Sequence, residues 1–150
     1  MYMAWLYRLT FSLLFLLVSW PVPAHAQDMS LVVIGNSKGV PPDLKLAQLK
    51  STMKGEKLRW PDGSKVVIAL LKSTTPIGQN TSKKIYNMSA NELNKFWLAL
   101  VFQGKADAPN FFNSEAELAE FVAQTTGAIG VVNQPAPGSK TITIDGKKSL

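Results

Sequence analysis

Three short apolar runs, rich in β-branched residues, constrain the fold of this chain more than any other feature of its sequence. They occupy residues 31–34, 66–71 and 129–132. Uninterrupted runs of this kind are typical of strands that are buried on both faces of a sheet. Segments with helical signals separate the runs, and parallel strands need such crossover connections. The pattern predicts a small α/β domain with a mixed, mostly parallel sheet flanked by helices.

The segments between these runs carry local signals of helices. Residues 43–54 follow two prolines, place apolar residues on one face and end at Gly55, which predicts a first helix. Pro76 suits the first position of a second helix. Near the end of the chain, residues 141–145 alternate strictly between polar and apolar, which predicts an edge or hairpin strand with one wet face.

Two further helices are predicted from capping boxes. Ser89 with Glu92, and Ser114 with Glu117, have the spacing at which a hydroxyl and a carboxylate satisfy the first backbone donors of a helix. In the first of these helices the apolar residues recur at intervals of three and four, which predicts a stripe that faces the core. The stripe consists of Leu93, Phe96, Trp97, Leu100 and Val101.

The first 26 residues have the organisation of a secretory signal peptide. Arg8 precedes an apolar run over residues 9–20, and the small residues Ala24 and Ala26 follow. The run is too short to span about 30 Å of hydrocarbon comfortably, so we expect cleavage after Ala26 rather than a retained anchor. With no cysteine near the cut there is no lipid attachment point. Residues 27–150 are therefore expected to form one domain, free in the periplasm or secreted.

The composition of residues 27–150 excludes most common catalytic chemistry. They contain no cysteine, and the single histidine, His25, lies in the predicted signal peptide. Thiolate and imidazole nucleophiles, zinc sites and disulfides are thereby excluded. The carboxylates are scattered rather than paired. We expect a protein that is not an enzyme and that carries neither a metal nor a cofactor.

The charge of the chain is moderately positive. It has 16 Lys and Arg against 10 Asp and Glu, and loss of Arg8 on cleavage leaves 15 basic residues and a net charge of +5. All but one of these 15 are lysines, and they lie along the whole chain without arginine clusters or interleaved aromatic residues. This distribution indicates a solvated surface that attracts small anions, and not a nucleic-acid partner.

Several segments together resemble the periplasmic phosphate-binding component of ABC transporters, and especially its short, stand-alone versions. The resemblance covers most of residues 27–150, and the aromatic helix after Ser89 and the Gly-Ala-Ile-Gly strand occur in the family's order. It implies a lobe of the periplasmic binding protein-like fold, whereas the full-length family holds phosphate between two lobes. The segments that carry it are residues 43–55, Trp60-Pro61-Asp62-Gly63, residues 88–105, residues 121–132 and Ile142-Thr143-Ile144-Asp145-Gly146.

The resemblance also implies a ligand-binding segment. In the family, a Ser-Gly-Thr-Thr-like segment at a helix start contributes hydroxyls to the phosphate site, and Ser73, Thr74 and Thr75 stand in about that place without the glycine. Hydroxyls before a helix N-terminus can seat an oxyanion, because unpaired amides and a partial positive charge lie there. The alternative is that Thr75 caps the helix while Ser73 and Thr74 fill a turn. Lys72 and Lys38 are candidate site charges, or else solvated strand ends.

A single lobe limits what such a site can do. A few hydrogen bonds, each contributing about 0.5 to 1.5 kcal/mol, minus the cost of immobilising the ligand, give an affinity in the millimolar range. Tight binding would require a second copy, in a homodimer, or another protein. Two hypotheses remain open: an oxyanion-binding module of the phosphate-receptor type, and a ligand-free interaction module that docks on a membrane sensor or an envelope complex. An exposed apolar patch would favour the second.

Overall fold

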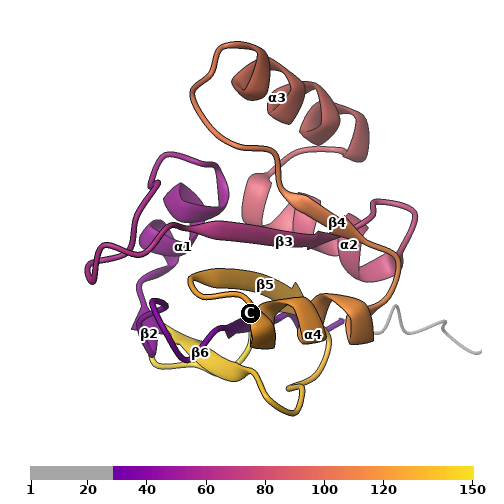
Figure 1. The fold of residues 1–150 in the computed structure, drawn as a ribbon. Coiled ribbons are helices and arrows are strands. Elements are labelled where there is room, and N and C mark those ends of the chain that lie inside the picture. Colours follow the sequence, from indigo (N-terminus) through magenta and orange to yellow (C-terminus); the bar gives the residue numbers. More distant parts are fainter. Residues whose placement is uncertain (1–28) are drawn as a thin grey trace, which may run out of the picture.

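A computed structural model describes residues 29–150 (Figure 1). The predicted signal peptide, residues 1–26, lies outside the described residues. The strands are β1 (Val32–Gly35), β2 (Asp43–Leu44), β3 (Val67–Leu71), β4 (Asn110–Phe112), β5 (Ala128–Val132) and β6 (Lys140–Ile144). The helices are α1 (Leu46–Met53), α2 (Pro76–Thr81), the π-helical turn η1 (Ser82–Tyr86), α3 (Ala90–Phe102) and α4 (Glu115–Gln124).

The strands form one sheet in the order β2-β6-β1-β5-β3-β4. β3 runs parallel to both β4 and β5, and β2 runs parallel to β6. β1 is antiparallel to its two neighbours, β5 and β6. The prediction of a mixed, mostly parallel sheet flanked by helices is therefore confirmed, and all three predicted apolar runs are central strands.

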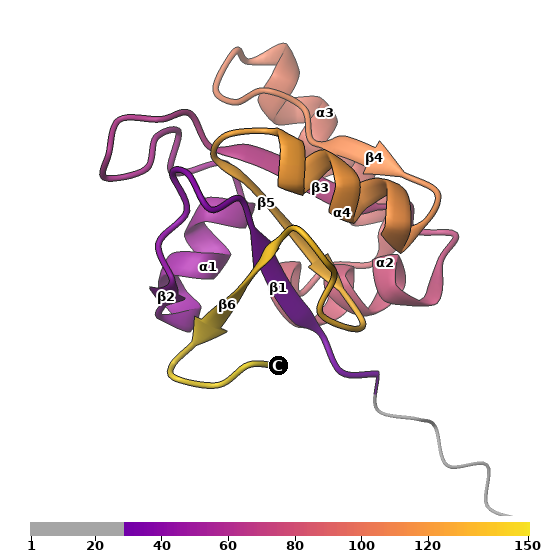
Figure 2. The same cartoon turned by 60° about the horizontal axis from the view of Figure 1, so that its bottom comes forward.

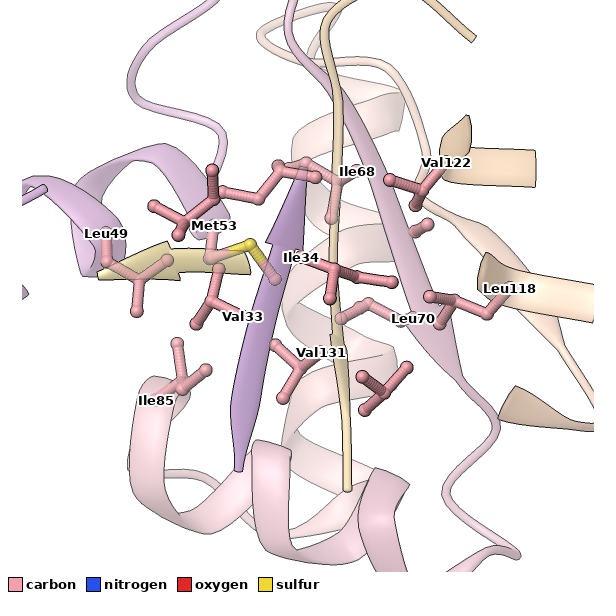
Figure 3. Close-up of a cluster of buried hydrophobic side chains, with 14 of the residues drawn as sticks. Val33, Ile34, Leu49, Met53, Ile68, Leu70, Ile85, Leu118, Val122 and Val131 are labelled. Atoms are coloured by element: carbon pink, nitrogen blue, oxygen red, sulfur yellow. The ribbon is translucent and has the colours of Figure 1, made fainter. Parts of the chain in front are cut away.

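Helices cover both faces of this sheet (Figure 2). Leu118 and Val122 of α4 lie on one side of the strands, whereas Leu49, Met53 and Ile85 from α1 and η1 lie on the other (Figure 3). These five side chains are almost completely buried. Their burial removes apolar surface from water on both faces, which explains why the central strands lack polar alternation.

A glycine in β5 sets how closely α4 approaches the sheet. A Cβ atom at Gly130 would lie 2.7 Å from Leu118 Cδ2 and 3.1 Å from the carbonyl oxygen of Ala69. Real Cβ atoms essentially never approach another heavy atom to 2.7 Å, so a side chain here would force Leu118, or α4 with it, to shift. The predicted Gly-Ala-Ile-Gly strand thus owes its second glycine to packing against a helix.

The prediction of an edge or hairpin strand at residues 141–145 is wrong, because β6 lies inside the sheet between β2 and β1. Two further local features also differ from what the sequence indicates. The first helix begins at Leu46 and not at residue 43, because Asp43 and Leu44 pair with Thr143 and Ile144 of β6 as strand β2. Backbone pairing with a distant strand here outweighs the local helix-start signal of the preceding prolines. The edge strand β4 is not predicted from the sequence at all, since three residues are too few to show a periodicity.

Helix α3 stands off from the body of the domain (Figure 1). Its predicted capping box is present: Ser89 N donates to Glu92 Oε2 over 2.7 Å, and this bond holds the pKa of the Glu92 carboxyl below its ordinary value. Edge-to-face contacts among Tyr86, Phe96 and Trp97 join the helix to η1. The prediction that Val101 faces the core is wrong, because its side chain is 43% exposed. In the last turn, Leu100 still packs against the core, whereas Val101 and Phe102 are exposed.

The described residues contain a complete core. The buried apolar side chains of this part of the chain all lie between Leu31 and Ile144, and every strand pairs with strands of the same segment. Residues 29–150 thus share one hydrophobic core and one sheet. Nowhere between residues 29 and 150 is a helix both long and apolar enough to cross a bilayer.

Asn36 joins the end of β1 to the end of α4. Its Nδ2 donates to the carbonyl oxygens of Val122 and Ala123 over 2.8 and 2.9 Å, and its Oδ1 accepts from Lys38 N over 2.8 Å. The side chain is buried. It therefore satisfies two carbonyl groups that the last turn of a helix leaves without intrahelical partners.

We predict that Asn36→Ala lowers the free energy of unfolding by about 3 kcal/mol, because it leaves buried polar groups unsatisfied. Urea denaturation of residues 27–150, followed by circular dichroism, measures the change. Asn94→Ala is the matched control, since Asn94 lies exposed on α3, and it should change the stability by less than about 0.5 kcal/mol. Equal effects of the two substitutions would contradict the role of Asn36.

Candidate functional site

The parallel strands bring three connecting segments together at one edge of the sheet. Because β3, β4 and β5 are parallel, their carboxyl ends meet at this edge, followed by residues 72–75, 113–114 and 133. Ligands of open α/β sheets bind outside the carboxyl ends of the strands. A hollow of about 280 Å³ lies there. Its lining residues are Met29, Leu71, Thr75, Pro76, Ile77, Asn113, Glu115 and Asn133.

Thr75 both lines this hollow and caps α2. Its Oγ1 accepts a hydrogen bond from Gly78 N over 3.0 Å and donates to the carbonyl oxygen of Lys72 over 2.8 Å. The hydroxyl proton is therefore used within the loop, which fits the interpretation of Thr75 as a cap. Gly78 is required for this arrangement, since a Cβ atom there would lie 2.2 Å from the Lys72 carbonyl oxygen.

Ser73 and Thr74 form the turn between β3 and α2. Ser73 is half-buried and Thr74 is exposed. Within the described part of the chain, neither hydroxyl makes a hydrogen bond. Both side chains thus remain available as donors at the strand ends, although of the three predicted residues only Thr75 lines the hollow.

Carboxylates neutralise the start of α4 on the other side of the hollow. Glu117 Oε2 accepts from Asn113 N over 3.2 Å, and Ser114 Oγ accepts from Glu117 N over 3.3 Å. Glu115 Oε2 accepts from Asn133 N over 3.0 Å. The carboxylates of Glu115 and Glu117 would repel an added anion at the start of α4. The hydrogen-bond donors available to an anion therefore lie in the turn between β3 and α2.

Sequence reasoning missed Glu115 and Asn133 as site residues. Glu115 has the ordinary position of an acidic residue in the first turn of a helix, so nothing in the local pattern marks it. Asn133 does carry a signal, because it directly follows the predicted strand at residues 129–132. Applying the rule of carboxyl strand ends to every predicted parallel strand would have placed it beside Ser73.

The two candidate lysines lie at opposite ends of the central strands. Lys72 directly follows β3 and is exposed beside the turn at Ser73. Lys38 follows β1, which runs antiparallel to β5, and its carbonyl oxygen accepts from Gly127 N just before β5 begins. The interpretation of Lys38 as a charge of this site is therefore wrong. As for metals, no cluster of three or more His, Cys, Asp or Glu side chains exists between residues 29 and 150.

Comparison with known proteins gives matches in structure alone. No protein-family profile matches the chain, and no curated protein does. An ABC-type phosphate transport receptor from Vibrio cholerae superimposes with a TM-score of 0.60 at 16% identity, over 81% of this chain and 48% of its own. A putative phosphate ABC transporter substrate-binding protein with bound phosphate from Clostridium perfringens gives 0.60 at 14%, over 81% and 47%. PstS from Borrelia burgdorferi gives 0.59 at 15%, over 79% and 48%.

These identities are low, so the likeness concerns the fold. The chain spans about half the length of each of the three solved structures that it matches. The resemblance drawn from the sequence is confirmed at this level, including the expectation of a single lobe. The chain has the fold of one lobe of the phosphate ABC transporter substrate-binding proteins.

Proposed function

We propose that residues 27–150 form a periplasmic, non-enzymatic oxyanion-binding module related to phosphate uptake, with phosphate as its ligand. The observation that carries the proposal is the shared fold, since one structure with this fold is described as holding bound phosphate. The gathering of hydroxyl groups at the carboxyl ends of the parallel strands supports it, because this is the edge where α/β sheets bind ligands. Export through a cleaved signal peptide, residues 1–26, is part of the same proposal.

In this proposal the turn between β3 and α2 supplies the donors. Ser73 and Thr74 donate their hydroxyl protons to the oxyanion, and Thr75 positions the turn through its bonds to Lys72 and Gly78. Lys72, exposed beside the turn, adds a favourable long-range attraction. A hydrogen bond to a charged oxygen contributes about 1.5 to 3 kcal/mol, so two hydroxyls and few further donors support millimolar binding.

Glu115 gives the hollow a preference among oxyanions. Its carboxylate can accept a hydrogen bond but cannot donate one. Inorganic phosphate keeps at least one hydroxyl proton near neutral pH and can donate it to such a carboxylate, whereas sulfate has none. A phosphate bound between Ser73 and Thr74 and the adjoining hollow lined by Thr75 and Glu115 would therefore be favoured over sulfate.

An uptake receptor needs tighter binding than one open wall provides. The hollow faces solvent, so water competes for every donor. A second copy of the domain in a homodimer, or another protein, would complete the cleft and exclude this water. The affinity of the isolated lobe is thus expected to be weak and to rise on association.

The second candidate function is a ligand-free interaction module that docks on a membrane protein or an envelope complex. The observation that favours it is the exposure of apolar side chains on α3, where Leu98 is 59% and Phe102 is 83% exposed. Large exposed apolar residues that cluster on one surface mark interaction sites. Under this alternative, no oxyanion binds at the strand ends.

Calorimetric titration separates the two functions. We predict that residues 27–150 bind phosphate with a dissociation constant of about 1 mM, with sulfate at least about tenfold weaker. Phosphate at about 10 mM should also raise the melting temperature, because the ligand binds the folded state. The absence of both heat and a melting shift would remove the oxyanion-binding proposal. Light scattering with and without phosphate shows whether association accompanies binding.

The turn itself is tested by removing its two available hydroxyls. We predict that Ser73→Ala combined with Thr74→Ala weakens phosphate binding by at least about tenfold, because two bonds to a charged ligand are lost. The matched control is Ser37→Ala combined with Thr126→Ala, two exposed hydroxyl residues at the opposite sheet edge. The control should leave the titration unchanged. If both double variants bind like the wild type, the turn is not the site.

Glu115→Gln tests the origin of selectivity. The amide oxygen can still accept from Asn133 N, so the loop after β5 keeps its anchor. We predict that phosphate loses its advantage over sulfate in this variant, and that sulfate binds more tightly than to the wild type because the repulsion between negative charges is gone. Parallel titrations with the two anions measure the ratio. An unchanged ratio would contradict the role of Glu115.

A further inference from the structure

The outer face of α3 exposes apolar side chains that no part of residues 29–150 covers. Leu98, Val101 and Phe102 have exposed fractions of 59%, 43% and 83%. They are spaced by three and four residues, so they lie on one side of the helix. The adjoining side carries Leu93 and Trp97, which are buried. A helix that is apolar around most of its circumference indicates a second partner for the outer face.

Leu58 extends this surface beyond the helix. It is 55% exposed and lines, together with Val101, a hollow of about 430 Å³. We define the α3 patch as Leu58, Leu98, Val101 and Phe102. Helix α3, which carries the other three residues, stands away from the sheet (Figure 1).

Basic residues surround the α3 patch. Arg59, Lys65 and Lys105 line the same hollow as Leu58 and Val101. Lys57 lines the adjoining hollow with Leu58, and Lys95 precedes Leu98 by one helical turn. Asp107 supplies the one carboxylate among the residues that line these two hollows, and it pairs with Lys65. The surface therefore combines exposed apolar side chains with an excess of positive charge.

We propose that the α3 patch binds the surface of an anionic phospholipid bilayer. Phe102 and Leu98 insert among the headgroups, while the surrounding lysines face the lipid phosphates. Apolar side chains next to lysines on one face of a helix are the composition of segments that lie in the membrane interface. Such binding is reversible, and it weakens as salt screens the charges.

The chemistry of the surface favours a lipid over other occupants. A second copy docked on the same patch would place its basic residues against these, and like charges repel. A protein partner is less favoured because protein interfaces are enriched in arginine and depleted in lysine. Four of the five basic residues around the patch are lysines, and only Arg59 is an arginine.

The position of the patch also decides how a bound lobe is oriented. The adjoining hollow is lined by Val66, Val67 and Asn110, at the amino ends of β3 and β4. Ser73 and Thr75 lie at the carboxyl ends of the same sheet. A lobe attached through the α3 patch would thus point the turn between β3 and α2 away from the membrane. The attachment itself does not depend on oxyanion binding.

Cosedimentation of residues 27–150 with vesicles tests the proposal. We expect binding to phosphatidylcholine vesicles that contain about one-third phosphatidylglycerol, and at least about tenfold weaker binding to pure phosphatidylcholine. Raising the salt from about 0.1 M to about 0.5 M should release most of the protein. Equal sedimentation with the two vesicle types, or none with either, would overturn the proposal.

Variants locate the contact. Phe102→Ser combined with Leu98→Ser, and separately Lys95→Gln combined with Lys105→Gln, should each reduce vesicle binding by at least about fivefold. All four side chains are exposed, so the fold is unaffected, and circular dichroism checks this. Two controls should bind like the wild type. Phe102→Leu keeps an apolar side chain in the patch. Lys147→Gln combined with Lys148→Gln removes charges beyond β6, on the far side of the sheet.

Two further results would count against lipid binding at this patch. The first is a dimer in light scattering that Phe102→Ser dissociates, in a protein that does not sediment with vesicles. The second is vesicle binding that the Phe102→Ser, Leu98→Ser variant retains in full. Either result overturns attachment through the α3 patch.

Discussion

The parallel pairing of β3 with both β4 and β5 is the constraint on which the rest of the structure depends. It places the three carboxyl strand ends at one edge and so brings residues from distant parts of the sequence, such as Thr75, Glu115 and Asn133, around one hollow. The same pairing needs crossover helices, and Gly130 lets α4 pack closely enough to serve as one. The position of the candidate site is thus a consequence of the sheet topology. The turn between β3 and α2 supplies hydrogen-bond donors at that position.

The predictable part of the fold is the part with strong local signals. The buried strands and the capped helices were visible in the sequence because apolar runs and Ser-x-x-Glu boxes act over a few residues. Strand β2 was missed because its pairing with β6 spans about a hundred residues and overrides the local signal at Asp43. The same reason explains which part of the site could be predicted. The turn at Ser73 directly follows a strand that the sequence predicts, whereas Glu115 lies near this turn only because β4 and β5 both pair with β3. Val101 was misplaced because periodicity identifies an apolar face but not how much of it the domain covers.

A single lobe provides only one wall of a ligand-binding cleft. The three solved structures that the chain matches are longer, and this chain spans about half the length of each. One wall leaves the hollow open to water, so the oxyanion binding that we propose would be weak unless another molecule closed the hollow. Its two distinctive surfaces lie at opposite edges of the sheet: the hydroxyl turn at one, and the basic, apolar α3 patch at the other. This separation allows the domain to be attached at one edge while the other stays accessible.

The most direct test of the central claim is a phosphate titration of ¹⁵N-labelled residues 27–150, followed amide by amide in ¹H–¹⁵N correlation spectra. Phosphate bound at the strand ends should give saturable shifts confined to the amides of residues 73–75, 77–78, Glu115 and Asn133, with a midpoint of about 1 mM. Shifts centred instead on the lysines around α3, or spectra that stay unchanged up to about 10 mM phosphate, would contradict the assignment of the oxyanion site to the carboxyl ends of the strands.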